Sequence, residues 1–190
     1  MQRTLGFFTS LLLLMGGCAD EVAPPDVASH GHHGPPRSVP TGPLVLEAED
    51  RLVFVGNTFA ERMDRSGCFE ALLHRAHPDL SLQVRSLAWP GDTPLLQPRP
   101  LDFGTMEQHL LEQEADIVVA CFGMNESFDG PAGIEAFQES LREFITSIRD
   151  LAPGGSEPEI VLVSPIAHED LGGDLPDGEQ HNRDLADYTE

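Results

Sequence analysis

The stretch Arg51-Leu52-Val53-Phe54-Val55-Gly56-Asn57-Thr58 decides the fold class of this chain. Its first five residues form a short β-type run that is apolar on both faces, which is typical of a strand buried in a parallel sheet. A glycine-asparagine-threonine turn follows directly, and residues 59–77 then carry apolar side chains at helical spacing. A strand, a turn and a helix in this order form the first unit of an α/β sheet.

The same alternation continues along the rest of the chain. Three further strands are predicted, at residues 80–87, 115–122 and 159–164. Three further helices are predicted, from residue 103 or 105 to 114, over 133–151, and from 180 to the last residue. Alternating polar and apolar residues place the first of these strands at a sheet edge, whereas the other two are buried runs. We therefore expect a three-layer α/β/α, flavodoxin-like parallel sheet.

The first 18 residues have the pattern of an export signal. A short head with Arg3 precedes an apolar run over residues 5–15, which is shorter than the about 20 residues of a membrane-spanning helix. The stretch Leu14-Met15-Gly16-Gly17-Cys18 resembles a bacterial lipobox, and this resemblance implies a lipid on Cys18. The alternative is an ordinary signal peptide with a chance cysteine. Both interpretations predict export, to the periplasm or the cell surface, with membrane contact only through the lipid.

Residues 19–48 are predicted to form a linker that leads to a folded domain over residues 49–190. Repeated prolines in the linker exclude a continuous helix or a central strand. The cluster His30-Gly31-His32-His33 has imidazoles that suit a transition metal. Because no neighbouring residues would set a coordination geometry, a solvated tether is the preferred interpretation.

Composition excludes several classes of function. The formal charge is −21, which argues against binding of nucleic acid or anionic lipid through a broad basic surface. No calcium loop and no nucleotide-binding glycine motif is present, and we expect no cofactor. The three cysteines have no metal-ligand spacing, and a Cys68–Cys121 disulfide is possible but is not decided by spacing.

Polar loops follow three of the predicted strands, at residues 56–58, 89–93 and 123–127. The carboxyl ends of parallel strands meet at one rim of the sheet, where ligands bind in such folds. These loops supply the hydroxyl of Thr58, the backbone amide of Gly91 and the carboxamide of Asn125. A nucleophilic oxygen beside uncharged N–H donors is what acyl transfer requires.

This order of motifs resembles the SGNH, or GDSL, hydrolase family. Gly56-Asn57-Thr58 stands where the family has Gly-Asp-Ser, and Gly123-Met124-Asn125-Glu126 where it has Gly-x-Asn-Asp, with Gly91 between them. The similarity covers about residues 50–170. It implies an esterase that removes acyl groups from a small molecule, a glycan or a lipid. Thr58 would be the nucleophile, and the N–H groups of Thr58, Gly91 and Asn125 would form the oxyanion hole.

Two departures from the family leave alternatives open. Thr58 replaces the family serine, and its β-methyl group restricts the rotamer. The Asp-x-x-His that supplies the family's base is absent, and His168 comes too early in the fold to replace it. We expect the base beyond residue 190, so that the domain is incomplete. Otherwise the domain never had a base, and it is an inactive binding module of a larger secreted protein, such as one with c-type haem modules downstream. A flavodoxin-like nucleotide binder ranks last.

Each site residue also has a purely structural interpretation. Thr58 could be the N-cap of the following helix, and Gly91 could serve only its turn. Asn125 could bond to the backbone of its own loop. His168 could be a polar residue whose hydrogen bonds are satisfied, and Glu126, like Asp129, could be a surface acid.

Overall fold

The computed structural model describes residues 42–99, 101, 103–167, 169–175 and 177–189. The predicted export signal with Cys18, the histidine cluster at residues 30–33 and His168 lie outside these ranges, so what was predicted for them stays a prediction. Within the ranges, every helix is too short or too polar to cross a membrane.

Within the described residues, four parallel strands form the sheet, in the order β2-β1-β3-β4. They are β1 (Arg51–Gly56), β2 (Gln83–Ser86), β3 (Ile117–Cys121) and β4 (Glu159–Leu162). The two apolar runs, β1 and β3, lie in the centre, because only a central strand is covered by neighbours on both sides. The edge position predicted for the second strand is confirmed, although β2 covers only the last part of residues 80–87.

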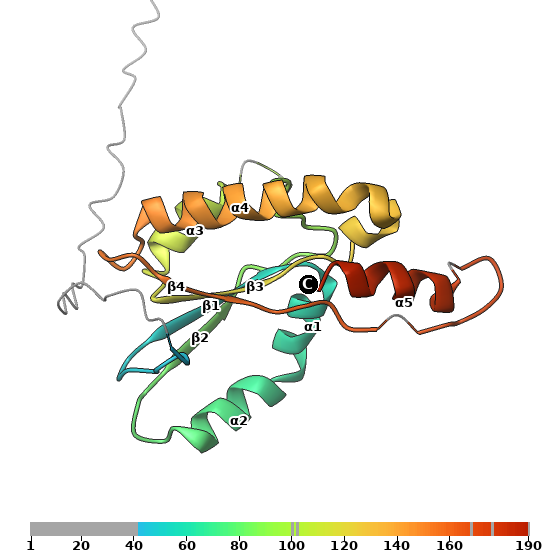
Figure 1. Cartoon of the computed structure of the whole chain (residues 1–190). Helices are drawn as coiled ribbons and strands as arrows, with labels where there is room; N and C mark the ends of the chain where they lie inside the picture. Colours follow the sequence, from blue (N-terminus) through green and yellow to red (C-terminus); the bar gives the residue numbers. More distant parts are fainter. Residues whose placement is uncertain (1–41, 100, 102, 168, 176, 190) are drawn as a thin grey trace, which may run out of the picture. The chain divides into compact units, whose positions relative to one another are not determined.

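Helices cover both faces of this sheet, which confirms the predicted three-layer α/β/α fold (Figure 1). One face carries α3 (Met106–Glu112) and α4 (Ile134–Leu151), and the other carries α1 (Thr58–Ser66) and α2 (Cys68–Ala76). Helix α3 begins where its sequence predicted, because Thr105 and Gln108 form a reciprocal capping box. Helix α5 (Gly178–Asp187) lies beside the 3-10 segment η2 (Glu126–Gly133), and it ends at Asp187 instead of continuing to residue 190.

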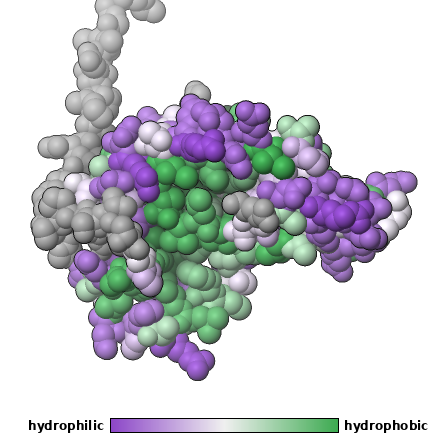
Figure 2. Space-filling model, viewed as in Figure 1, coloured by the Kyte–Doolittle hydropathy of each residue, from purple (hydrophilic) through white to green (hydrophobic). Residues whose placement is uncertain are grey.

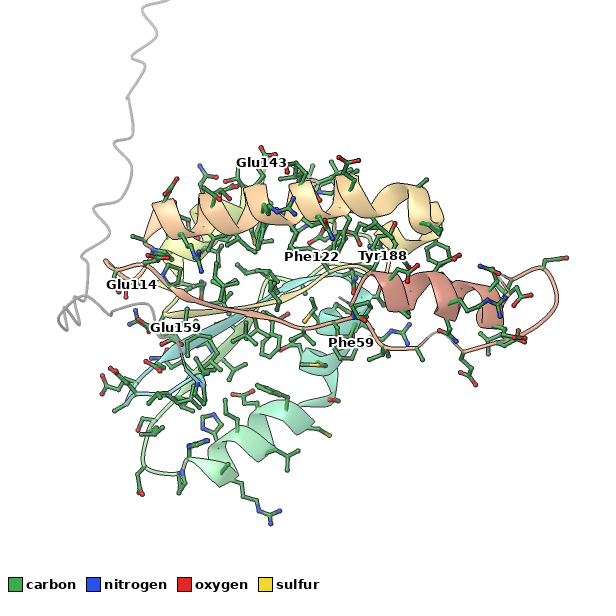
Figure 3. All side chains as sticks on the ribbon, in the orientation of Figure 1. Phe59, Glu114, Phe122, Glu143, Glu159 and Tyr188 are labelled. Carbon is green, nitrogen blue, oxygen red and sulfur yellow. The ribbon has the colours of Figure 1, made fainter. Side chains whose placement is uncertain are left out.

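Alternate residues of β1 supply two separate cores. Val53 and Val55 pack with α3 and α4, whereas Leu52 and Phe54 pack with α1 and α2. Figure 3 shows the same division, with Phe122 between the sheet and α4 and Phe59 on the opposite side, near α1. Residues pointing to both faces are therefore apolar, which is why the strand lacks the alternation of a half-exposed sheet.

The single helix predicted over residues 59–77 is wrong, since the structure has two helices there. Gly67 separates α1 from α2 with a φ of +62°, and its N–H donates to the Asp64 carbonyl as a C-cap. Glycine adopts this left-handed conformation at little cost, so the chain can change direction there. The helical spacing of apolar residues continues past Gly67, so the sequence pattern did not show that the helix ends there.

The last strand was predicted to be buried, and this is also wrong. β4 pairs only with β3, and its residues are half-buried, with Leu162 51% exposed. Figure 2 shows hydrophobic residues gathered at this edge of the sheet, below the hydrophilic outer surface of α4. An apolar run identifies a strand but does not say whether the sheet continues on its other side.

The two described cysteines are not joined. Cys68 is exposed at the start of α2, whereas Cys121 is buried in β3, and both are free thiols. Burial raises the pKa of Cys121 to about 11, because the apolar surroundings disfavour a thiolate. The possible Cys68–Cys121 disulfide is therefore not formed in this structure.

Candidate active site

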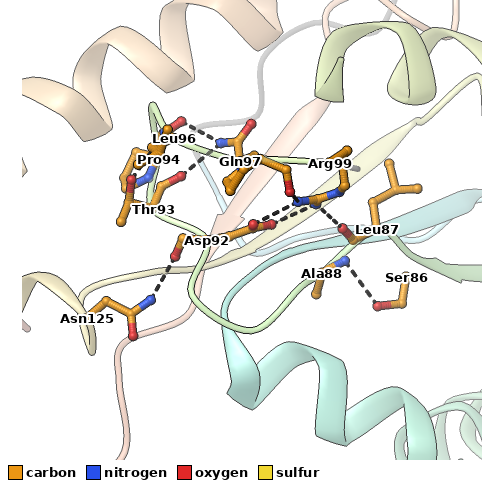
Figure 4. Close-up of polar contacts among 11 residues, drawn as sticks. Ser86, Leu87, Ala88, Asp92, Thr93, Pro94, Leu96, Gln97, Arg99 and Asn125 are labelled. Atoms are coloured by element: carbon orange, nitrogen blue, oxygen red, sulfur yellow. Dashed lines mark hydrogen bonds and ion pairs between the residues drawn. The ribbon is translucent and has the colours of Figure 1, made fainter. Parts of the chain in front are cut away.

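Two hydrogen bonds bring the three polar loops together at the carboxyl ends of the strands. The N–H of Trp89 donates to the carbonyl of Gly56 at 3.0 Å, which joins the second loop to the first. The Nδ2 of Asn125 donates to the carbonyl of Asp92, also at 3.0 Å, which joins the third loop to the second (Figure 4). Thr58, Gly91 and Asn125 therefore lie on loops that contact one another, as their positions after parallel strands predicted.

Asn57, not Thr58, caps helix α1. Its backbone is extended (φ −88°, ψ −161°), and its Oδ1 accepts from the N–H of Phe59 at 3.1 Å. Its own N–H donates to the Cys121 carbonyl at 3.2 Å, so the cap is held against the central strand β3. The N-cap interpretation of Thr58 is thus wrong, since Asn57 is the N-cap and satisfies the N–H of Phe59, the second residue of the helix.

Thr58 is the first residue of α1 and is partly exposed. None of the residues that the structure describes forms a hydrogen bond with its hydroxyl. Its N–H lies in the first turn of the helix, where backbone donors have no acceptor within the helix. Thr58 therefore presents a hydroxyl and a backbone donor at the positive end of the α1 dipole.

Gly91 lies in an exposed turn with a φ of +90°, a conformation that favours glycine. No atom lies within 4 Å of the position that a Cβ would take, so the requirement is conformational and not steric. The turn is closed by the N–H of Asp92, which donates to the Trp89 carbonyl at 3.1 Å. The structural interpretation of Gly91 as a turn residue is confirmed, and a role of its amide in catalysis stays a prediction.

Asn125 does not bond to the backbone of its own loop. It precedes η2 without a side-chain cap, and its carboxamide instead reaches the carbonyl of Asp92. A carboxamide has two N–H donors, and the described chain provides an acceptor for only one of them. The second N–H of Asn125 is therefore available to a ligand.

An ion pair that sequence reasoning missed lies directly behind these loops. The side chain of Asp92 is fully buried and receives two hydrogen bonds of 2.8 Å from the guanidinium of Arg99. Arg99 also donates to the carbonyl of Leu87 at 2.9 Å (Figure 4). Asp92 and Arg99 lie seven residues apart in a proline-rich loop, which has no helical or strand periodicity. The sequence therefore gave no indication that they pair.

Glu126 is not a surface acid. Its Oε2 accepts from the N–H of Gly123 at 2.9 Å, and its Oε1 is buried with no hydrogen-bond partner among the described residues. Burial raises the pKa of this carboxyl above its usual value, and Asp129 nearby adds to the effect. Asp129 is itself exposed, as predicted. Glu126 thus stabilises the loop at residues 123–126 through this hydrogen bond, with its carboxyl group largely buried.

A buried serine–histidine contact links helix α5 to the same loop. The Oγ of Ser127 donates to the Met124 carbonyl at 2.8 Å and lies 2.8 Å from Nε2 of His181. The hydroxyl has a single proton, so Nε2 is the donor to Ser127 when that proton is directed to Met124, and it is the acceptor in the other tautomer. The His181 ring also stacks on Phe128 with centroids 4.0 Å apart. The contact holds α5 against the loop. Ser127 and His181 are 54 residues apart in the sequence, and no motif joins them, so sequence reasoning missed this contact.

An open pocket of about 190 Å³ lies beside this contact. Its lining residues are Ser127, Phe128, Asp177, Gln180, His181 and Asp184. In the part of the chain that the structure describes, no three histidine, cysteine or acidic side chains gather in a way that could hold a metal ion.

Several solved structures share this fold, among them the following three. A gut microbial diltiazem-metabolizing enzyme matches with a TM-score of 0.53 and 18% identity, over 75% of this chain and 33% of its own. A protein from Parabacteroides merdae described as a GDSL-like lipase matches with a TM-score of 0.51 and 14% identity, over 76% of this chain and 75% of its own. An acetyl xylan esterase matches with a TM-score of 0.51 and 15% identity, over 73% and 68%.

These similarities show an SGNH/GDSL-hydrolase-like fold, and at such low identity they show the fold alone. The chain spans about a third of the length of the diltiazem-metabolizing enzyme. No protein-family model matches the sequence, and no curated protein matches it. The chemistry must therefore be argued from the three loops.

Proposed function

We propose that this protein is an exported ester hydrolase that removes acyl groups from a small molecule or a glycan. One observation carries the proposal: the loops of Thr58, Gly91 and Asn125 are hydrogen-bonded to one another at the carboxyl ends of the strands. The fold shared with an esterase and a GDSL-like lipase supports it. So does the order of the motifs along the chain.

The oxyanion side of the reaction has uncharged donors in place. The N–H of Thr58 begins helix α1, whose dipole favours negative charge at that end. The N–H of Gly91 lies in an exposed turn, and the second N–H of Asn125 has no acceptor in the described chain. Donors that are held in position before the reaction stabilise the charge on the tetrahedral intermediate without reorganising.

The hydroxyl of Thr58 would form the new bond. Its Oγ1 attacks the ester carbonyl carbon, the carbonyl oxygen becomes the oxyanion, and its collapse expels the alcohol and leaves an acyl-threonine. A base must take the hydroxyl proton and return it to the alcohol, after which water releases the acyl group. The family resemblance implies a histidine for this base, in an Asp-x-x-His element that does not occur in these 190 residues.

Export is proposed from the sequence of residues 1–18, with Cys18 as the lipidated residue. The test is expression of the full precursor, with and without Cys18→Ser, in a bacterial host fed labelled palmitate. Label on the first protein and not on the second is expected. Equal labelling of both proteins would exclude Cys18 as the lipid site.

The catalytic proposal is tested with the longest chain that the gene encodes, assayed on p-nitrophenyl acetate and on acetylated xylan. Thr58→Ala is expected to lower kcat about 10³-fold or more, and Asn125→Ala about 10²- to 10³-fold. Thr58→Ser is expected to keep or raise the rate, because serine lacks the β-methyl group. Thr146→Ala, an exposed threonine on α4, is the matched control. Unchanged hydrolysis by Thr58→Ala would exclude the nucleophile.

The second candidate function is glycan binding without catalysis. It is favoured by the Thr58 hydroxyl, which no described side chain contacts as a base. Binding on a glycan array with no turnover of the bound esters would support this function. Measurable turnover that Thr58→Ala abolishes would exclude it.

A further inference from the structure

Among the ion pairs of the residues that the structure describes, the Asp92–Arg99 pair is the most enclosed. The Asp92 side chain is fully buried and that of Arg99 is 9% exposed, whereas the members of the Arg183–Glu179 pair are 57% and 86% exposed. Two parallel N–H···O contacts of 2.8 Å match the fork of the guanidinium to both carboxylate oxygens. Two hydrogen bonds therefore fix the orientation of the Asp92 carboxylate. A lysine ammonium, which acts as a point charge, could not fix it in this way.

Arg99 also connects this pair to the sheet. Its Nη2 donates to the Leu87 carbonyl at 2.9 Å, and the N–H of Leu87 donates to the Phe54 carbonyl of β1 at 2.8 Å. The guanidinium therefore ties Asp92 to a residue whose position the central strand determines. The long loop between Leu87 and Arg99 is closed by this tie, although it has no regular secondary structure.

The backbone carbonyl of the same aspartate holds Asn125. A carboxamide can rotate about its last side-chain bond, and an acceptor on one side selects the orientation of both N–H groups. Here the acceptor is the Asp92 carbonyl, 3.0 Å from Nδ2. The direction of the second N–H, which the proposed function assigns to the oxyanion hole, then depends on where Asp92 is held.

We infer that Arg99 is a positioning residue for the oxyanion side of the site. Through Asp92 it orients the carboxamide of Asn125, without itself touching the substrate. This inference rests on the proposed function for its catalytic consequence, but the orientation of Asn125 is a property of the protein whether or not it hydrolyses esters. The competing explanation is that Arg99 only neutralises a buried carboxylate.

Arg99→Lys separates the two explanations, because lysine keeps the positive charge and loses the fork. Positioning predicts that kcat falls about 10- to 100-fold while KM is unchanged, as expected when a catalytic group is displaced by a fraction of an ångström. The matched control is Arg183→Lys, which changes an exposed ion pair and leaves kcat unchanged.

A second readout does not require activity. The side-chain amide signals of Asn125, assigned by their loss in Asn125→Asp, are recorded in the ¹H–¹⁵N NMR spectrum of the ¹⁵N-labelled protein. In the wild type the proton bonded to Asp92 is expected downfield of its partner, and in Arg99→Lys the two signals move together. Unchanged Asn125 signals in Arg99→Lys would overturn the inference, whatever happens to the melting temperature.

The two proposals fail in different ways. A wild type that hydrolyses no ester removes the proposed function, and the Asn125 signals then decide the positioning role alone. If Arg99→Lys does not fold, the double variant Asp92→Asn with Arg99→Gln replaces it. This variant leaves no unpaired buried charge, and it still removes the two hydrogen bonds from the guanidinium. Wild-type Asn125 signals in this double variant would also overturn the inference.

Discussion

Gly56 is the residue at which β1 turns toward helix α1, and Gly56→Ala tests how tightly the Thr58 turn is held. The φ of Gly56 is +125°, a conformation that L residues rarely adopt. An alanine Cβ there would lie 2.2 Å from the carbonyl oxygen of Cys121 and 2.8 Å from its carbonyl carbon. Both atoms belong to β3, which pairs with β1 at this position and cannot shift without losing that register.

Two costs add in this variant. A non-glycine residue in a disfavoured backbone conformation costs about 1–3 kcal/mol, and overpacking against atoms that cannot move costs about 1–3 kcal/mol more. We therefore expect the free energy of unfolding to fall by about 2–6 kcal/mol, a large part of the about 5–15 kcal/mol of a typical domain. The loss of chain entropy in the unfolded state acts the other way, by about 0.4–1 kcal/mol.

Gly67→Ala is the matched control for this change. Gly67 also has a positive φ, +62°, but no atom lies within 4 Å of its Cβ position. Its loss should therefore be limited to the conformational cost, about 1–2 kcal/mol. The difference between the two variants isolates the contact with Cys121.

Urea unfolding followed by circular dichroism measures both variants. Fluorescence gives a local second signal, because the backbone N–H of Trp89, the single tryptophan of the chain, donates to the Gly56 carbonyl. Gly56→Ala should change the emission of the folded protein, and Gly67→Ala should not. Equal losses of stability in the two variants would refute the close approach of Gly56 to β3.

Two further predictions concern buried titratable groups. Because burial raises the pKa of Glu126 above 4.5, its contribution to stability is complete below that pH and is lost as the pH rises through the folded-state pKa. Glu126→Gln should therefore gain stability relative to the wild type between about pH 4 and pH 8 in urea unfolding; a constant difference would contradict this. Burial also raises the pKa of Cys121 to about 11. Cys68→Ser should thus remove one thiol that reacts with Ellman's reagent in the folded protein, and Cys121→Ser should remove none.

The central strands and the class of fold were predictable from the sequence. The runs in β1 and β3 are apolar on both faces, and only a strand covered by helices on both sides has that composition. The meeting of the three loops also followed from sequence, since parallel strands have their carboxyl ends at one rim. Local patterns sufficed because each of these properties depends on neighbours in the chain and on the direction of the strands.

The contacts between the loops were decided only by the tertiary structure. Asn57 and Thr58 are both suitable N-cap residues by type, and only the structure shows that Asn57 accepts the cap bond while its N–H reaches Cys121. From the sequence, Asp92 and Arg99 would be interpreted as two surface charges, whereas the structure buries them as an ion pair. Their pairing, like that of Ser127 with His181, comes from the three-dimensional path of the loops, and no period of a helix or strand records that path.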